Sequence, residues 1–153
     1  MNIGLMAHDS KKKLMQNFCI AYKGILCKHN LYATGTTGRL IENVANLTIH
    51  KHLAGSLGGD EQLGSQIENN ELDLMIFLRD PNIRGMHGDY GSKIPRLCDV
   101  HNIPLATNLA TAETLVLALD RGLTSGLIVA GIILAIYSSS SSSSPKNPRL
   151  LSS

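Results

Sequence analysis

Residues 72–78 read LDLMIFL, a short run that is apolar at every position but one. Runs of this length are typical of a strand buried on both faces of a parallel sheet. A second such run, IGLMA, occupies residues 3–7. Three further candidate strands lie at residues 30–34 (NLYAT), 48–53 (TIHKHL) and 104–107 (PLAT). Residues 3–107 therefore predict five strands.

Segments with helical spacing lie between these strands and after the last one. We expect helices at 11–28 after a cap at Ser10, from Thr36 or Thr37 to about Asn46, from near Asp60 onward, at 93–101 despite Pro95, and from Thr111 to about Arg121. Strands that alternate with helices at this spacing form parallel βαβ units. The predicted fold class is therefore α/β, with a doubly wound, mostly parallel five-stranded sheet that carries helices on both faces.

The length of 153 residues is usual for one α/β domain. We assign residues 1–137 to this domain. Within it, residues 126–137 (GLIVAGIILAIY) are too few to span a bilayer, and they suit a last buried strand. Residues 138–153 begin with seven serines, a composition typical of a mobile tail.

The composition excludes two classes of protein. An apolar content of 43% provides enough side-chain volume for a core, which excludes a disordered chain. Fourteen basic and twelve acidic residues leave a net charge of +2, with one basic block at 11–13, which argues against nucleic-acid binding through bulk charge. The three cysteines, Cys19, Cys27 and Cys98, form no C-x-x-C and cannot all pair. We therefore expect a reduced, cytoplasmic setting.

The segment ATGTTG at residues 33–38 places glycines and threonines at a strand-to-helix junction. Glycines let backbone N–H groups approach an anion, threonine hydroxyls add donors, and the helix dipole favours negative charge. The segment is therefore a candidate phosphate cradle. It differs from a P-loop and from G-x-G-x-x-G, and a tight turn followed by a threonine cap explains it equally well.

The segment AGSLGGDEQ at residues 54–62 repeats this arrangement. Gly55 and Ser56 supply another N–H group and another hydroxyl, and Asp60 lies at or just inside a helix start. Taken alone, Asp60 is explained as an ordinary N-cap. Beside a second anion-binding turn, however, its carboxylate is also placed to act as a base toward a phosphate-bearing substrate.

Ionisable residues follow other strand ends. His8 and Asp9 come directly after the first predicted strand, with Lys12 one turn later. His87 lies in the long loop near the sheet edge and is a candidate acid or electrophile. The charged residues around that loop are Asp80, Asp89 and Arg96. The other four histidines have no third ligand at metal spacing, so we expect no metal site.

Together, these segments resemble the methylglyoxal synthase family. The shared motifs, in chain order, are AHDSKK (7–12), ATGTTG (33–38), AGSLGGDEQ (54–62), FLRDP with the following MH (77–87), and IPLATNLATAE (103–113). Each motif alone is weak, but five in sequence are specific. The resemblance implies a flavodoxin-like sheet, a homohexamer, and conversion of dihydroxyacetone phosphate to methylglyoxal and inorganic phosphate. It also implies inhibition by phosphate and no metal or organic cofactor.

The resemblance assigns roles residue by residue. It makes Asp60 the base that removes a proton from the substrate carbon, and His87 a group that stabilises the enediolate. The residues that would hold the substrate, chiefly its phosphate, are His8, Lys12, Thr34, Gly35, Thr36, Thr37, Gly55 and Ser56. Asp9, Asp80 and Arg96 match supporting positions.

Two features depart from the family pattern. The family has an aspartate three residues after the loop histidine, whereas this chain has Tyr90 there, with Asp89 one place earlier as a candidate substitute. Beyond residue 122 the chain also departs from the family's C-terminal segment, which usually supplies an arginine near the phosphate. Arg149 is the candidate for that role here.

Two other functions stay open at this stage. The same fold serves as the regulatory domain of carbamoyl-phosphate synthetase, which senses phosphorylated effectors without catalysis, and fold alone does not separate the two functions. A phosphosugar isomerase is a third reading. The Gly-Gly-Asp sequence, retained together with His8 and His87, favours the lyase, because a sensor does not require these residues.

Overall fold

A computed structural model describes the protein at residues 1–83, 90–121 and 136–139. Five strands form one sheet in which every neighbouring pair is parallel. They are β1 (Asn2–Ala7), β2 (Asn30–Ala33), β3 (Ile49–Lys51), β4 (Leu74–Leu78) and β5 (Leu105–Ala106). The predicted five-stranded α/β sheet is thus confirmed, and it is parallel throughout.

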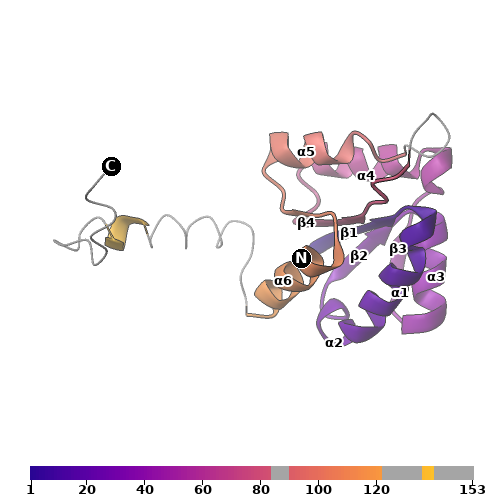
Figure 1. Cartoon of the computed structure of the whole chain (residues 1–153), viewed down its shortest axis with the longest axis horizontal. Coiled ribbons are helices and arrows are strands. Elements are labelled where there is room, and N and C mark those ends of the chain that lie inside the picture. The colour runs from indigo at the N-terminus through magenta and orange to yellow at the C-terminus, as the bar shows by residue number, and fades with distance from the viewer. Residues whose placement is uncertain (84–89, 122–135, 140–153) are drawn as a thin grey trace.

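The segments between the strands are helical, as their alternation predicts. The helices are α1 (Lys12–Ala21), α2 (Lys23–Leu26), α3 (Gly35–Ala45), α4 (Gly59–Glu68), α5 (Ile94–His101) and α6 (Leu109–Asp120), with 3-10 turns at Asp9–Lys11 and Gly55–Leu57. The predicted first helix is therefore split in two. Figure 1 shows α4 and α5 on one face of the sheet, and α1, α3 and α6 on the other.

The sheet separates two hydrophobic cores. Ile3 and Leu5 of β1 point into the larger core, with α1, α3 and α6, whereas Met6 points into the smaller core, with α4 and α5. Leu5 pairs with Ala33 in β2 and with Ile76 in β4, so β1 lies at the centre of the sheet. Because helices cover both faces, successive side chains of a central strand are all buried, which explains its continuous apolar run.

The strand order refines the expected topology. Flavodoxin has the order 2-1-3-4-5, whereas this sheet has β3-β2-β1-β4-β5. The order reverses between β1 and β4. In doubly wound sheets, ligands bind at such a reversal, beyond the carboxyl ends of the strands. His8 directly follows β1, and Asp80 lies just after β4, so both lie at the favoured place.

Three predicted helix starts differ from those in the structure. Ser10 makes no cap, because its hydroxyl donates instead to Asp80 Oδ2 at 2.5 Å. The N-cap of α3 is Thr34 and not one of the two threonines that follow it. The N-cap of α6 is Asn108, whose side-chain oxygen accepts a hydrogen bond from the Thr111 backbone N–H at 3.0 Å. Asparagine is a better N-cap than threonine, which explains the shift of this boundary.

The C-terminal predictions fall mostly outside the described residues. Residues 126–135 of the predicted last strand, and 140–153 of the predicted tail, belong to the part that the structure does not describe. Ile136 and Tyr137 are 64% and 72% exposed and belong to a helical turn, so a buried strand does not extend through them. No helix in the described ranges is both long and apolar enough to cross a bilayer.

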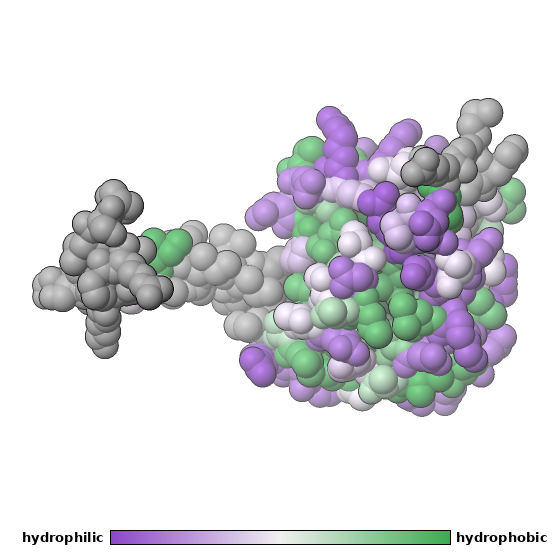
Figure 2. Space-filling view, viewed as in Figure 1, coloured by the Kyte–Doolittle hydropathy of each residue, from purple (hydrophilic) through white to green (hydrophobic). Residues whose placement is uncertain are grey.

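Some large apolar side chains are exposed on the helical layers. On the face seen in Figure 2, hydrophilic side chains surround a central group of hydrophobic ones. Ile20 of α1, Val44 of α3 and Leu117 of α6 are each at least 44% exposed. Single exposed apolar residues are ordinary, but several on one layer provide surface for contacts with another chain.

Candidate active site

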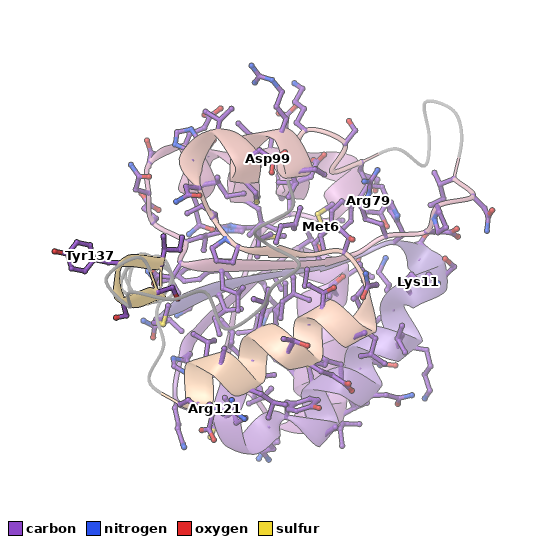
Figure 3. All side chains as sticks on the ribbon, turned by 60° about the vertical axis from the view of Figure 1, so that its left-hand side comes forward. Met6, Lys11, Arg79, Asp99, Arg121 and Tyr137 are labelled. Atoms are coloured by element: carbon purple, nitrogen blue, oxygen red, sulfur yellow. The ribbon has the colours of Figure 1, made fainter. Side chains whose placement is uncertain are left out.

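Most of the predicted site residues that the structure describes follow the carboxyl ends of the strands. In Figure 3, Lys11 and Arg79, which follow β1 and β4, lie at this carboxyl edge of the sheet, and Arg121 lies at the opposite end of the molecule. Lys11 and Arg79 border an open hollow of about 540 Å³, together with Thr107 beyond β5. Both of these side chains carry a positive charge, which suits an anionic ligand.

The segment after β2, a candidate phosphate cradle, forms the start of α3. Thr34 and Thr37 are 2% and 1% exposed. The N–H groups in the first turn of a helix have no intrahelical acceptor. That of Gly35 donates to the Leu53 carbonyl at 2.8 Å. The Thr37 hydroxyl, in contrast, has no hydrogen-bond partner within the described part of the chain. A buried hydroxyl left unpaired costs about 1–3 kcal/mol, so this group is suited to a ligand.

The two glycine-rich motifs pack against the same short segment after β3. A Cβ atom on Gly35 would lie 2.7 Å from the His52 carbonyl oxygen, and one on Gly59 would lie 1.9 Å from the Leu53 carbonyl oxygen. Only glycine lets the two helices begin this close to the backbone. The starts of α3 and α4 therefore lie beside each other, which brings the two predicted anion-binding turns together.

Asp60 lies inside the first turn of α4. Gly58, with φ of 98°, occupies the N-cap position, so Asp60 is not the N-cap. The Asp60 Oδ2 atom accepts a hydrogen bond from the Gly91 N–H at 2.7 Å, and Oδ1 accepts one from the Glu61 N–H at 3.0 Å. The carboxylate is thus held between α4 and the segment that precedes α5. It also borders a cavity of about 280 Å³ between these two helices.

His8 is 3% exposed at the end of β1. Its Nδ1 atom accepts a hydrogen bond from the Asp80 N–H at 2.9 Å. The other ring nitrogen, Nε2, lies 3.2 Å from the Tyr90 carbonyl oxygen. Because a carbonyl can only accept, Nε2 carries the proton, and the ring is a neutral imidazole in one defined tautomer. The ring edge also packs on Tyr90, with 5.0 Å between the ring centres.

Lys12, Asp9 and Tyr90 form a polar cluster beside His8. Lys12, only 14% exposed, forms an ion pair with Asp9, and its hydrogen bond holds the pKa of the Asp9 carboxyl below its usual value. The Tyr90 hydroxyl donates to the Ala7 carbonyl at 3.2 Å and lies 3.4 Å from Lys12 Nζ. The Tyr90 ring packs on Gly55, where a Cβ atom would lie 2.7 Å from the ring. Burial raises the pKa of the Tyr90 phenol.

The remaining predicted residues divide into three groups. Asp80 lies at the site edge, where the hydrogen bonds from the Ser10 hydroxyl and the Asn82 N–H hold the pKa of its carboxyl below the usual value. Ser56 and Arg96 are exposed, on the 3-10 turn and on α5. His87 and Asp89, like Arg149, lie outside the described residues.

Sequence reasoning missed the role of Gly91. Its φ is 79°, and a Cβ atom there would lie 2.6 Å from Met6 Cε and 2.8 Å from Phe77 Cζ. Gly91 is therefore the residue that lets the backbone reach Asp60 over the smaller core. A glycine shortly before a predicted helix was the available signal. Tyr90 was singled out only because the family has an aspartate there, and nothing in the sequence placed its ring on Gly55.

Within the described ranges, no group of three or more His, Cys, Asp or Glu side chains is arranged to hold a metal ion. Fold and site together define a doubly wound α/β domain with a candidate anion-binding site at the switch point of its sheet. The chain belongs to the family of MGS-like domains, whose model matches residues 15–107.

Named relatives agree with this assignment. The chain is 62% identical over 122 residues to a methylglyoxal synthase of Caldicellulosiruptor saccharolyticus, a match that covers 80% of this chain and 86% of the relative. It is 54% identical over 123 residues to one from Thermoanaerobacterium thermosaccharolyticum, covering 80% and 92%. The crystal structure of a methylglyoxal synthase from Elizabethkingia anophelis has a similar fold, with a TM-score of 0.71, 42% identity, and coverage of 75% and 76%.

Proposed function

We propose that this protein is a carbon–oxygen lyase that converts dihydroxyacetone phosphate to methylglyoxal and inorganic phosphate. The names of its relatives support this activity, at 54% and 62% identity over four-fifths of the chain. One structural observation carries the proposal. The carboxylate of Asp60 is held at the sheet edge beside a helix start, where the buried hydroxyl of Thr37 has no partner among the described residues.

The phosphate of the substrate binds at the start of α3. There, backbone N–H groups, the helix dipole and the Thr37 hydroxyl all favour an anion. Lys12 adds a positive charge from the neighbouring α1. The residues to which we assign phosphate binding are Lys12, Thr34, Gly35, Thr36, Thr37, Gly55 and Ser56.

Asp60 acts as the general base. It takes a proton from the hydroxymethyl carbon of the substrate, and the electron pair of that C–H bond forms an enediolate with the neighbouring carbonyl. The negative charge on the enediolate oxygen needs hydrogen-bond donors, a role that we assign to His87. The enediolate then expels phosphate. The electrons of the C–O bond leave with the phosphate, while the hydroxyl on the deprotonated carbon loses its proton and becomes the aldehyde. The remaining enol then gains a proton at its methylene carbon and loses its hydroxyl proton, which gives methylglyoxal.

The position of the phosphate relative to Asp60 determines the product. Elimination needs the C–O bond to the phosphate roughly perpendicular to the plane of the enediolate. An isomerase that acts on the same substrate must hold that bond in the plane. Fixed positioning of this kind contributes on the order of 7–11 kcal/mol at best. The cradle therefore selects the reaction as well as binding the substrate.

We further propose that the protein assembles as a homohexamer, is inhibited by phosphate, and works in the cytoplasm. Exposed apolar side chains on α1, α3 and α6 support assembly, and the three free cysteines fit a reducing compartment. Light scattering with and without inorganic phosphate tests the assembly. The same measurement on a chain that ends at residue 137 tests whether the serine-rich tail contributes.

The activity is tested by a coupled assay on the purified chain. Methylglyoxal, inorganic phosphate and glyceraldehyde 3-phosphate are measured together after addition of dihydroxyacetone phosphate. Equal release of the first two supports the lyase. Release of glyceraldehyde 3-phosphate supports an isomerase instead, and phosphate binding without any product supports a regulatory module.

A further inference from the structure

Tyr90 joins three segments of the candidate site through one side chain. Its hydroxyl donates to the carbonyl of Ala7, the last residue of β1, at 3.2 Å. The same oxygen lies 3.4 Å from Nζ of Lys12, the first residue of α1. The ring packs on Gly55, at the start of the 3-10 turn after β3, where a Cβ atom would lie 2.7 Å from the ring. Two of these partners, Lys12 and Gly55, are residues to which we assign phosphate binding.

The direction of the hydrogen bonds at the Tyr90 hydroxyl follows from the groups around it. A phenol carries one proton, an ammonium group can only donate, and a carbonyl can only accept. The phenol proton is therefore directed to the Ala7 carbonyl, which is nearer than Asp9 Oδ1 at 3.4 Å. The lone pairs of the phenol oxygen are left to accept from Lys12. Burial raises the pKa of the phenol, so its proton stays in place at neutral pH.

Tyr90 is the more firmly held of the two partners of Lys12. The Lys12 side chain is 14% exposed, and its ammonium group contacts Asp9 and the Tyr90 oxygen. Asp9 is 87% exposed, so water competes for its carboxylate. The Tyr90 ring, in contrast, packs on Gly55 and on the edge of the His8 ring, with 5.0 Å between the ring centres. An ammonium group has three N–H donors, so these two contacts leave one for a ligand.

We propose that Tyr90 is a positioning residue, which holds the Lys12 ammonium group in place for the phosphate of the substrate. A lysine side chain is long and flexible, so the loss of its rotamer freedom opposes binding. A fixed partner orders the side chain in advance and thereby strengthens binding. The inference rests on the proposed function, because it concerns the phosphate group of that substrate. It also gives a role to a residue at which this chain departs from the family pattern.

Tyr90→Phe separates the role of the hydroxyl from that of the ring. Phenylalanine keeps the packing on Gly55 and removes only the oxygen that accepts from Lys12. We expect the Kd of inorganic phosphate, measured by calorimetry, and the KM for dihydroxyacetone phosphate to rise together, by about three- to tenfold. The value of kcat should stay within about twofold, because Asp60 keeps its partners. Tyr22→Phe, at the other end of α1, is the control and should change neither constant.

The effect of Tyr90→Phe should depend on Lys12. In a Lys12→Met background, we expect it to change kcat/KM by less than about 1.5-fold, because the group that the phenol positions is gone. The ratio kcat/KM can be measured even where the substrate no longer saturates the enzyme. A hydroxyl that only stabilises the fold would cause the same loss in both backgrounds, and that result overturns the inference.

Thermal melting shows whether Tyr90→Phe folds. In a folded variant, unchanged phosphate affinity overturns the inference. Tighter phosphate binding also overturns it, because the hydroxyl would then compete with the ligand. A fall in kcat at unchanged KM has the same consequence, since the hydroxyl would then act on the reaction step and not on binding.

A measurement on lysine decides even if Tyr90→Phe does not fold. In protein labelled with ¹⁵N at lysine, the Nζ signal of Lys12 is assigned by its loss in Lys12→Met. We expect the Nζ protons to exchange with water more slowly than those of Lys28, which is 64% exposed, and to remain slow in Asp9→Asn, where Tyr90 is retained. Exchange as fast as in Lys28 in either protein overturns the inference. A wild-type protein that binds phosphate but forms no methylglyoxal, in contrast, rejects the proposed function, while the calorimetry still tests Tyr90.

Discussion

The two sides of the candidate site are built differently. One side, which we call the base side, consists of Asp60, His8 and Gly91. The polar atoms of Asp60 and His8 have protein partners, and Gly91 is fixed by close packing. On the cradle side, the buried Thr37 hydroxyl has no partner in the described structure. The base side is thus organised by protein contacts alone, whereas the cradle keeps a buried hydroxyl for the ligand that we propose. This difference fits an enzyme that binds its substrate through the phosphate group and reacts at a carboxylate that is already in position.

The largest expected effect on kcat comes from a substitution on the base side alone. Asp60→Asn removes the proposed base but keeps an oxygen that can accept from Gly91, so the fold should persist. General bases contribute on the order of 10²–10⁴ in rate, and we expect kcat to fall by about that factor. Phosphate affinity, measured by calorimetry, should stay within about twofold because Thr37 and Lys12 are untouched. Near wild-type turnover would show that another group is the base.

The second effect tests the rigidity of the base side. An alanine at Gly91 would need φ of 79° and would meet Met6 and Phe77 at 2.6–2.8 Å. Left-handed strain and overpacking each cost about 1–3 kcal/mol. We expect Gly91→Ala to lower the free energy of unfolding, measured in urea, by at least the lower of these values and to reduce kcat as well.

Gly24→Ala is the matched control for this measurement. Gly24 lies in α2 with nothing within 4 Å of its Cβ position. Alanine is favoured over glycine in a helix by about 0.5–1 kcal/mol, so this variant should be neutral or slightly more stable. A similar loss in the free energy of unfolding in the two variants would mean that the close packing at Gly91 does not contribute to stability.

The difference between the two sides also limits what the sequence alone could predict. The turn that we propose as the cradle was predictable, because Gly-Thr-Thr-Gly between a strand and a helix is a local pattern with a local consequence. The strands were predictable for the same reason, since their burial appears as runs of apolar residues. The predicted helix starts also lie only a few residues from the observed N-caps, Thr34 and Asn108.

The base side was predictable only in its residue types. Asp60 was identified, but its contact with Gly91 joins positions that are 31 residues apart. The bond from Asp80 to His8 spans 72 residues. No local pattern encodes such contacts, because they arise when the strand order reverses between β1 and β4. The position of the Tyr90 ring on Gly55 is hidden for the same reason.

The third effect tests the cradle. Thr37→Val replaces a buried hydroxyl by a methyl group of the same shape. Because no described residue pairs with the hydroxyl, its removal should raise the free energy of unfolding by about 1 kcal/mol. A hydrogen bond to a charged group contributes about 1.5–3 kcal/mol, so phosphate affinity should fall by at least about tenfold. Stability and binding are therefore expected to change in opposite directions.

Thr114→Val provides the control for the cradle variant. Thr114 is exposed on α6, and its hydroxyl already donates to the Ala110 carbonyl at 2.9 Å. This variant should leave phosphate affinity unchanged and should not stabilise the protein. A Thr37→Val protein that is less stable and still binds phosphate as well as the wild type would contradict the assignment of this hydroxyl to the ligand.

The smallest effect concerns the ion pair of Lys12 with Asp9. The hydrogen bond from Lys12 holds the pKa of Asp9 below its usual value of 3.8. A carboxyl whose pKa is lowered by folding stabilises the protein above its usual pKa, and this contribution is lost as the pH falls through the lowered value. Because the Asp9 side chain is 87% exposed, Asp9→Asn should destabilise the protein by less than about 1 kcal/mol at neutral pH.

Urea unfolding at neutral pH and well below pH 3.8 distinguishes this pair from an ordinary surface pair. Asp120→Asn is the control, because Asp120 pairs with Lys28, which is 64% exposed, whereas Lys12 is 14% exposed. A less hydrated lysine depends more on its partner, so the effect at Asp9 should exceed that at Asp120 at neutral pH. In acid, wild type and Asp9→Asn should converge, since the protonated carboxyl no longer pairs. A difference that persists in acid would mean that Asp9 stabilises the edge of the cradle through packing rather than charge.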